Sequence, residues 1–315
     1  MDFMKILNSC VLCPHKCRSS RIKGELGVCK AGSTAEISSV IVHYGEEPPI
    51  SGFRGSGTIF FTKCNMSCIY CQNYQISQEY NTNNYQKVSN EKLAEIMIDL
   101  QDKQCHNVNL VSPTIWIANI AEAIKIARDN LNLKLPIVFN SGGYDRTEII
   151  KMLKGYINIY MPDIRYNTDE YAFKYSGVKN YVENNRRSII EMYNQVGGLK
   201  LNSEGVAEKG LIVRLLILPN NIGEVKKSLD FIKNELSTDV YISIMSQYRP
   251  LYKAYKYPEL NRRINFREYK EILNYAEKLG LSFGSFQEFS SFSSDEKEDP
   301  FIPDFQNKDV FKFKK

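Results

Sequence analysis

The segment that decides the fold runs from Thr58 to Cys71 and reads TIFFTKCNMSCIYC. A short apolar strand at 58–61 leads directly into three cysteines with C-x3-C-x2-C spacing, Cys64, Cys68 and Cys71. Soft thiolate sulfur suits iron, and three thiolates on one tight loop can hold three corners of a four-iron cube. The fourth iron then keeps an open position, which is typical of a reactive metal site. The residues also leave open a three-cysteine zinc site, or three buried cysteines.

The alternation of apolar strand and amphipathic helix continues along the chain. Helical spacing is clear in Leu93, Ile96, Met97 and Leu100, with Ser89 as the N-cap. Further strands are expected at 108–111, 137–140, 157–161, 211–218, 240–245 and 281–286, and further helices at 117–124, 148–153, 189–193, 225–232 and 269–279. Strands that are apolar at nearly every position are typical of parallel sheets covered on both faces. The sequence therefore predicts an α/β fold, a partial (β/α)6 barrel of TIM type.

Three regions are expected along the chain. Residues 1–50 form a small cysteine-rich metal-binding module, and residues 51–288 form the barrel, close to the ~250 residues of such barrels. Residues 289–315 form a polar tail in which Phe301, Ile302 and Phe305 are candidates to dock on the body. Active sites of barrels collect where the strands end, so the cysteine loop is expected at the barrel mouth.

Composition narrows the function classes. The chain has 315 residues with 41 Lys and Arg against 36 Asp and Glu, a net charge of +5 without long blocks of like charge. That balance gives no reason to expect nucleic-acid or membrane-surface partners. No apolar run suits a signal peptide or approaches the ~18 residues of a membrane span, so a cytoplasmic protein is expected. In a reducing compartment its eight cysteines are not expected to form disulfides, and their clustering indicates metal.

The three-cysteine motif, with Tyr70 just before its last cysteine, resembles that of the radical S-adenosylmethionine (SAM) enzymes. The resemblance implies a 4Fe-4S cluster on Cys64, Cys68 and Cys71 whose open iron binds SAM. An electron from the cluster would cleave SAM to methionine and a 5′-deoxyadenosyl radical, which takes hydrogen from a substrate. The resemblance thus implies an oxidoreductase, with Tyr70 near the adenine and an electron donor such as flavodoxin or ferredoxin.

A closer resemblance covers nearly the whole chain. Its segments are CVLCPHKC at 10–17 with GVC at 27–29, CQNYQIS at 71–77, NLVSPT at 109–114, NSGGY at 140–144, YMPDIRY at 160–166 and RLLILP at 214–219. Together they resemble the uncharacterised proteins related to pyruvate formate-lyase activating enzyme. This resemblance implies two kinds of substrate, a glycine backbone in a glycyl-radical enzyme, or a peptide or small molecule modified directly.

One departure from the superfamily pattern matters. Many members carry Gly-Gly-Glu after the second strand to bind the SAM amino group, whereas this chain has Val111-Ser112-Pro113-Thr114. The amino-group contact is therefore left without a named residue. The departure is also the basis of an alternative function, a non-catalytic iron–sulfur or zinc-binding scaffold that has lost SAM cleavage.

Polar residues at the strand ends are candidates to bind cofactor or substrate. Asn140 and Ser141 follow the third strand, where an ordinary polar turn is the other reading. Asp163 suits a ribose hydroxyl or a substrate amine, and equally a partner for Arg165 or a helix cap. Arg214 interrupts an apolar run, and a charge in a buried strand is costly unless paired. It is therefore expected to bind an anion such as the cofactor carboxylate, or else to form a buried ion pair.

The first cysteine group is a second candidate metal site. Cys10, Cys13, Cys17 and Cys29 offer four thiolates, enough for a tetrahedral zinc or a second 4Fe-4S cluster. We favour an auxiliary cluster, because iron–sulfur machinery would already load the protein. Such a cluster would relay electrons or ligate substrate, whereas zinc would hold the module together. His15 is expected to be a solvent-facing loop residue, and Cys105 a structural cysteine.

Overall fold

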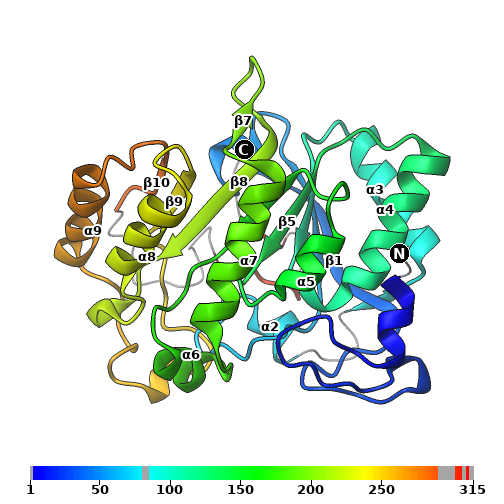
Figure 1. The fold of residues 1–315 in the computed structure, drawn as a ribbon, viewed down its shortest axis with the longest axis horizontal. Helices are drawn as coiled ribbons and strands as arrows, with labels where there is room; N and C mark the ends of the chain where they lie inside the picture. Colours follow the sequence, from blue (N-terminus) through cyan, green and yellow to red (C-terminus); the bar gives the residue numbers. More distant parts are fainter. Residues whose placement is uncertain (1–2, 80–84, 290–301, 307–309, 312–315) are drawn as a thin grey trace.

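The computed structural model describes residues 3–79, 85–289, 302–306 and 310–311. Its described part is centred on a ten-stranded sheet in the order β10-β9-β8-β6-β5-β4-β2-β1-β3, with β7 paired to β8 (Figure 1). The strands are β1 Ala35–His43, β2 Ser56–Phe61, β3 Gln86–Val88, β4 Val108–Val111, β5 Ile137–Ser141, β6 Ile159–Pro162, β7 Lys200–Leu201, β8 Ala207–Leu216, β9 Tyr241–Met245 and β10 Gly284–Phe286.

Seven of these strands, in the order β10-β9-β8-β6-β5-β4-β2, run parallel to one another. The strands β2, β4, β5 and β6 are buried at every position, as expected when both faces of a parallel sheet are covered. The two ends of the sheet, β3 and β10, are not neighbours in it, so the barrel is open. The predicted α/β fold with a partial TIM-type barrel is confirmed.

Helices connect the parallel strands. Their bounds are α1 Pro48–Ser51, α2 Tyr74–Ser77, α3 Asn90–Asp102, α4 Ile117–Leu131, α5 Thr147–Met152, α6 Asp169–Ser176, α7 Tyr181–Val196, α8 Val225–Phe231 and α9 Phe266–Lys278. The expected cap of α3 is present, since the Ser89 hydroxyl accepts a hydrogen bond from Lys92 N at 3.1 Å. None of the described helices is long and apolar enough to cross a lipid bilayer.

Residues 3–50 pack onto the barrel along one side (blue in Figure 1). Two 3-10 helices, Phe3–Asn8 and Arg21–Lys23, precede β1, which pairs antiparallel with both β2 and β3. Phe3, Leu7 and Leu12 are buried in the same hydrophobic core as the barrel strands and α4. The connection from β1 to β2 runs through α1 and carries Glu46 and Glu47.

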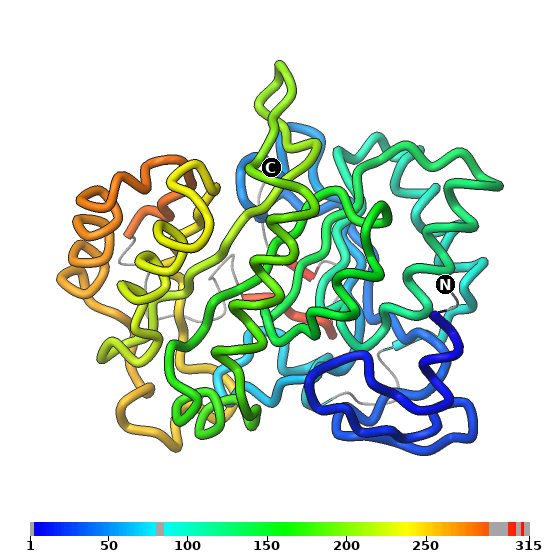
Figure 2. The backbone as a smooth tube through the Cα atoms, in the orientation of Figure 1, coloured from blue at the N-terminus to red at the C-terminus, as the bar shows by residue number. Residues whose placement is uncertain are grey.

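The described part of the C-terminal region lies against the inner edge of β2 and β4 (red in Figure 2). Phe305 and Val310 are buried together with Phe60, Ile76 and Val111. The Phe305 ring meets the Phe60 ring edge to face at 5.2 Å between centroids. This contact agrees with the expectation that Phe305 docks. Phe301 and the acidic run at 295–299 lie outside the described residues.

Candidate functional site

The cysteine loop begins at the carboxyl end of β2 and is anchored by β1. Lys63 adopts a left-handed conformation (φ 63°), which turns the chain sharply out of the strand. Its ammonium group forms a buried ion pair with Glu36 of β1 at 2.8 Å. Glu36 also accepts a hydrogen bond from the Thr62 hydroxyl at 3.2 Å. A paired charge is tolerated in the interior, so this contact fixes where the loop starts.

The three thiols of the loop lie close enough to influence one another. Burial raises the pKa of the Cys64 thiol to about 12, and the neighbouring Cys68 adds to the rise. Burial raises the pKa of the Cys71 thiol to about 11. Such thiols stay protonated at neutral pH until a metal displaces the proton. Across the described residues, no three His, Cys, Asp or Glu side chains are arranged to hold a single metal ion.

Each sulfur of the loop has a hydrogen-bonding neighbour. These are Met66 N at 3.4 Å from Cys64, Ser77 Oγ at 3.2 Å from Cys71, and Ser176 Oγ at 3.0 Å from Cys68. The last contact continues into the interior, because the Tyr166 hydroxyl lies 2.8 Å from Ser176 and 2.6 Å from the Tyr70 hydroxyl. Hydrogen bonds to ligand sulfurs help to set the reduction potential of an iron–sulfur cluster.

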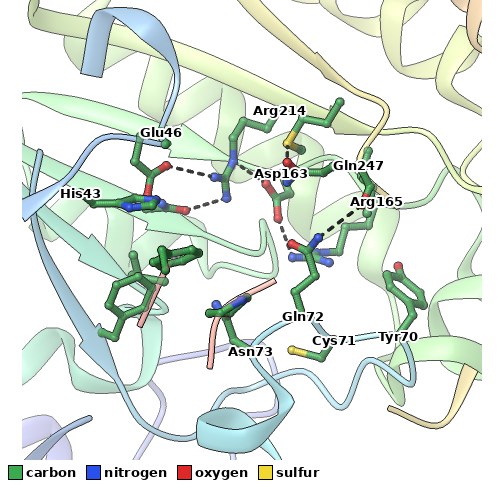
Figure 3. A pocket seen from close by; sticks show the side chains of 18 residues that line it. His43, Glu46, Tyr70, Cys71, Gln72, Asn73, Asp163, Arg165, Arg214 and Gln247 are labelled. Atoms are coloured by element: carbon green, nitrogen blue, oxygen red, sulfur yellow. Dashed lines mark hydrogen bonds and ion pairs between the residues drawn. The ribbon is translucent and has the colours of Figure 1, made fainter. Parts of the chain in front are cut away.

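A pocket opens beside the cysteine loop (Figure 3). Its apolar lining includes Phe60, Val111, Leu216, Met245 and Phe311, and its polar lining includes His43, Glu46, Tyr70, Cys71, Gln72, Asn73, Asn140, Asp163, Arg165, Arg214 and Gln247. The polar residues come from the ends of several strands and from the loop itself, as the barrel topology predicts. The Cys71 thiol and several charged side chains therefore line the same pocket.

Arg214 stands at the centre of the charged side chains (Figure 3). It interrupts the buried strand β8, and its Nε lies 2.8 Å from Asp163 while its Nη2 donates to Asn140 Oδ1 at 2.6 Å. A third contact, at 3.8 Å, reaches Glu46. Asp163 also pairs with Arg165 at 2.6 Å. Arg214 thus forms a partly buried ion pair within the pocket wall, and Asp163 is the partner of both arginines.

Glu46 and Glu47 reach this network from the connection between β1 and β2. Asn109 donates to Glu46 at 2.9 Å, and both glutamates are largely shielded from solvent. Burial raises the pKa of each carboxyl, while the charge of Arg214 opposes the rise. Sequence reasoning missed these residues. Two adjacent acids just before Pro48-Pro49 were the available signal.

The strand-end residues expected at the site separate into two groups. Tyr70, Asn140, Asp163 and Arg214 line the pocket together with Cys71. Ser141 does not line it, and its hydroxyl instead donates to the buried Asp145 at 2.5 Å. Arg165, which also lines the pocket, had been considered only as a partner for Asp163.

The N-terminal cysteines gather elsewhere. Cys10, Cys13, Cys17 and Cys29 line one small cavity of their own. His15 does not face solvent as expected, because it is half-buried and its Nε2 lies 2.8 Å from the Asn65 carbonyl oxygen in the second cysteine loop. Cys105 is buried in the main hydrophobic core, consistent with a structural role.

Comparison with known proteins gives one family and one close relative. A family model described as the radical SAM superfamily matches residues 58–232, which include the cysteine loop, Asp163 and Arg214. The "Uncharacterized protein MJ0674" of Methanocaldococcus jannaschii is 32% identical over 283 residues, or 88% of this chain and 76% of that protein.

Solved structures resemble the chain more distantly. SuiB of Streptococcus suis is 14% identical with a TM-score of 0.46, over 73% of this chain and 47% of SuiB. HydG, a maturase of the FeFe-hydrogenase, is 12% identical with a TM-score of 0.47, over 70% of this chain and 48% of HydG. Methylornithine synthase (PylB) is 13% identical with a TM-score of 0.47, over 75% of this chain and 74% of PylB. The chain thus spans about half the length of SuiB and of HydG.

Proposed function

Since the chain belongs to the radical SAM superfamily, we propose that it is an oxidoreductase whose 4Fe-4S cluster is held by Cys64, Cys68 and Cys71. The cluster, when bound, supplies the electron that cleaves SAM and leaves a 5′-deoxyadenosyl radical able to take hydrogen from a substrate. The observation that carries this proposal is the pocket itself. Cys71 and Tyr70 line the same cavity as the charged side chains around Arg214.

The residues of the pocket fit a ligand that bears both an amino group and a carboxylate. Arg165 lines the pocket, and its buried Nε has no hydrogen-bond partner. A buried donor left unpaired is costly, so a ligand oxygen there would be favourable. Glu46 and Asp163 are carboxylates that face the same cavity and suit an amino group or ribose hydroxyls. Together these groups could bind both charges of a methionine moiety.

Of the five residues expected to contact the cofactor, four line the pocket. These are Tyr70, Asn140, Asp163 and Arg214. Arg214 contacts Asp163 through Nε, Asn140 through Nη2 and Glu46 through Nη1. Its first role is therefore to hold these side chains in position. The hydroxyl of Ser141 is engaged by Asp145, and no contact supports it as a ligand of the cofactor.

The missing Gly-Gly-Glu does not leave the pocket without an acid. Val111, at that strand end, lines the pocket with an apolar side chain, while Glu46 brings a carboxylate from the connection between β1 and β2. The pocket thus has a carboxylate from the β1–β2 connection in place of one after β4. This favours an enzyme over the scaffold alternative. The apolar side chains on the walls, such as Phe60 and Phe311, would exclude water from a reactive intermediate.

The test is release of 5′-deoxyadenosine from SAM by anaerobically reconstituted protein and a strong reductant. Cys68→Ala removes one cluster ligand and is expected to reduce release to background, because a cluster on two cysteines is not held in place. Cys105→Ala is the matched control, since that buried cysteine lies in the main core and not at the pocket. Wild-type release from Cys68→Ala would contradict the assignment.

The substrate is proposed by class. The hydrogen donor is a glycine backbone in a partner enzyme, as for the activases, or a peptide or small molecule that enters the pocket. An electron donor of the flavodoxin or ferredoxin type completes the proposed cycle. Substrates deuterated at the reacting carbon distinguish the two classes, because the true substrate transfers deuterium into 5′-deoxyadenosine.

A further inference from the structure

Four cysteines converge on one cavity in the N-terminal region. Cys10 and Cys13 are buried, Cys17 and Cys29 are half-buried, and all four are free thiols. The chain folds back tightly between them, since Arg18 N donates to Cys10 O at 2.8 Å and Lys16 N to Cys13 O at 3.1 Å. These side chains come from positions up to nineteen residues apart, yet they line the same small space.

The backbone packs closely around these sulfurs. Val28 N lies 3.4 Å from Cys17 Sγ, and the backbone N–H groups of His15 and Ala31 lie beside the sulfurs of Cys13 and Cys29. The Cys17 loop comes so close to Gly27 that a Cβ there would lie 2.8 Å from the Cys17 sulfur. Hydrogen bonds to ligand sulfurs are among the features by which a protein tunes an iron–sulfur cluster. The backbone around this cavity therefore suits a group bound through sulfur.

A buried arginine lines the same cavity. Arg21 is only 2% exposed, and its Nε and Nη1 donate to the carbonyl oxygens of Gly32 and Ile115 at 2.6 and 2.7 Å. Its Nη2 has no hydrogen-bond partner, and no carboxylate among the described residues forms an ion pair with it. The guanidinium lies over the Trp116 ring, 5.1 Å from its centroid, and this contact offsets only part of the cost of burying the charge. An anion beside it would offset more of that cost. The cavity of the four cysteines is the adjacent space for that anion.

We propose that Cys10, Cys13, Cys17 and Cys29 form a second metal centre with four thiolate ligands, and that Arg21 is its buried counter-cation. No three of these cysteine side chains are arranged around a single ion, so the larger 4Fe-4S cluster is the group that the four cysteines fit. Four thiolates around a 4Fe-4S core of charge +2 leave a net charge of −2, which would satisfy the free N–H of Arg21. With four thiolate ligands such a cluster has no open position.

The second centre also adjoins the first. His15, two residues after Cys13, lies 2.8 Å from the carbonyl oxygen of Asn65 and packs edge to face on Tyr144. Asn65 Nδ2 in turn donates to Tyr144 O at 2.6 Å. Metal bound by the N-terminal cysteines would therefore rigidify a segment that contacts the loop of Cys64.

Metal analysis of three anaerobically purified full-length proteins tests the site. They are the wild type, the triple variant Cys64→Ala/Cys68→Ala/Cys71→Ala, and the double variant Cys10→Ser/Cys13→Ser. The triple variant is expected to keep about four irons with about four sulfides, and the double variant to lose them. Zinc without iron in the triple variant would contradict the cluster. A triple variant without stoichiometric metal would overturn the proposal.

This result is independent of the proposed function. If the triple variant keeps metal while the wild type releases no 5′-deoxyadenosine, the second centre stands and the SAM chemistry fails. If the wild type is active and the triple variant is metal-free, the reverse holds.

The role of Arg21 has its own measurement. Arg21→Met removes the charge at similar length and is expected to speed loss of the metal to a chelator by roughly tenfold or more, in the triple-variant background. Arg21→Lys keeps the charge and should stay closer to the unmodified rate. Arg128→Met, at a part-buried arginine bonded to Gly155 and Tyr156, is the control. Equal rates of metal loss from Arg21→Met and from the protein that keeps Arg21 would overturn the counter-cation assignment.

Discussion

Cys68 is connected to the pocket by a row of buried hydroxyl groups. With Cys68 as a thiolate ligand, Ser176 must donate its one proton to the sulfur, and Tyr166 must then donate to Ser176. Tyr70, which lines the pocket, completes the row by donating to Tyr166. All four residues are at most 5% exposed, so water does not compete for these bonds. The Ser176 hydroxyl would thus draw electron density from the Cys68 sulfur.

Ser176→Ala is expected to lower the reduction potential of the cluster by tens of millivolts. Removing a hydrogen bond to the sulfur destabilises the more negative, reduced state, and about 59 mV corresponds to a tenfold change for a one-electron couple. The measurement is a redox titration of the reconstituted protein followed by electron paramagnetic resonance. Ser188→Ala, at a buried serine bonded to Asn185 O, is the control. An unchanged potential in Ser176→Ala would show that the bond does not act on the cluster.

Single residues differed in how far the sequence could predict them. Arg214 stood out because a charge in an apolar run must have partners, and it proved to bind Asp163 and Asn140. Glu46 and Arg165 gave only weak signals, since acids before two prolines and an arginine after a strand also suit an exposed turn. Only the folded chain brings Glu46 within 3.8 Å of Arg214, 168 residues further along.

Elements were predictable where packing is uniform. Strands buried on both faces, such as β4 and β5, read as apolar runs, and α3 and α4 show a clear helical stripe. The short α6 was missed, because its buried side is made of Ala172, Tyr175 and Ser176, a mixed surface without an aliphatic stripe. The burial of α6 depends on contacts with other segments, and the local sequence pattern does not predict these contacts.

The C-terminal segment acts as one wall of the pocket. Pro303 and Phe311 line the cavity, and the Phe311 ring stacks on His43 at 4.2 Å between centroids. Phe305 anchors the segment against Phe60, and its backbone N–H donates to Gln75 at 2.9 Å. Among the described residues, aromatic contacts with β2 and β1 therefore contribute to the attachment.

Phe305→Ala is expected to release this segment without unfolding the barrel. Truncating a buried phenylalanine costs about 3–5 kcal/mol, which weakens the attachment of the segment. Limited proteolysis followed by mass spectrometry should then show C-terminal cleavage faster by roughly tenfold or more. Phe173→Ala, at a ring that is 57% exposed on α6, should leave the cleavage rate unchanged. Equal protection of both variants would contradict the anchoring role.

For the whole molecule, the proposed function predicts a link between metal and ligand stabilisation. SAM that binds the folded, cluster-loaded protein at 100 times its Kd should stabilise it by about 2.7 kcal/mol and raise Tm by a few degrees. The triple variant at Cys64, Cys68 and Cys71 lacks the open iron and should show little shift. Thermal scans of both proteins across SAM concentrations make the comparison. Equal shifts would mean that SAM binds without the cluster.

The arrangement of the N-terminal region lay beyond sequence reasoning. Four closely spaced cysteines indicate a metal-organised module, but they do not reveal that Arg21 reaches Ile115 or that Arg146 donates to Val11 O at 2.8 Å. Such contacts join segments 94 and 135 residues apart. They depend on the barrel that lies between them, and no local pattern encodes them.

The contact between Arg21 and Ile115 has a consequence for how the chain is made. During synthesis the four N-terminal thiols leave the ribosome first, while Ile115, which closes their cavity, follows Arg21 by 94 residues. At ~5–20 residues per second this interval lasts roughly 5 to 20 s. For that time the thiols are exposed on an unfinished nascent chain. If these thiols hold the proposed second centre, metal delivery to it would compete with oxidation of the thiols before the barrel exists to shield them.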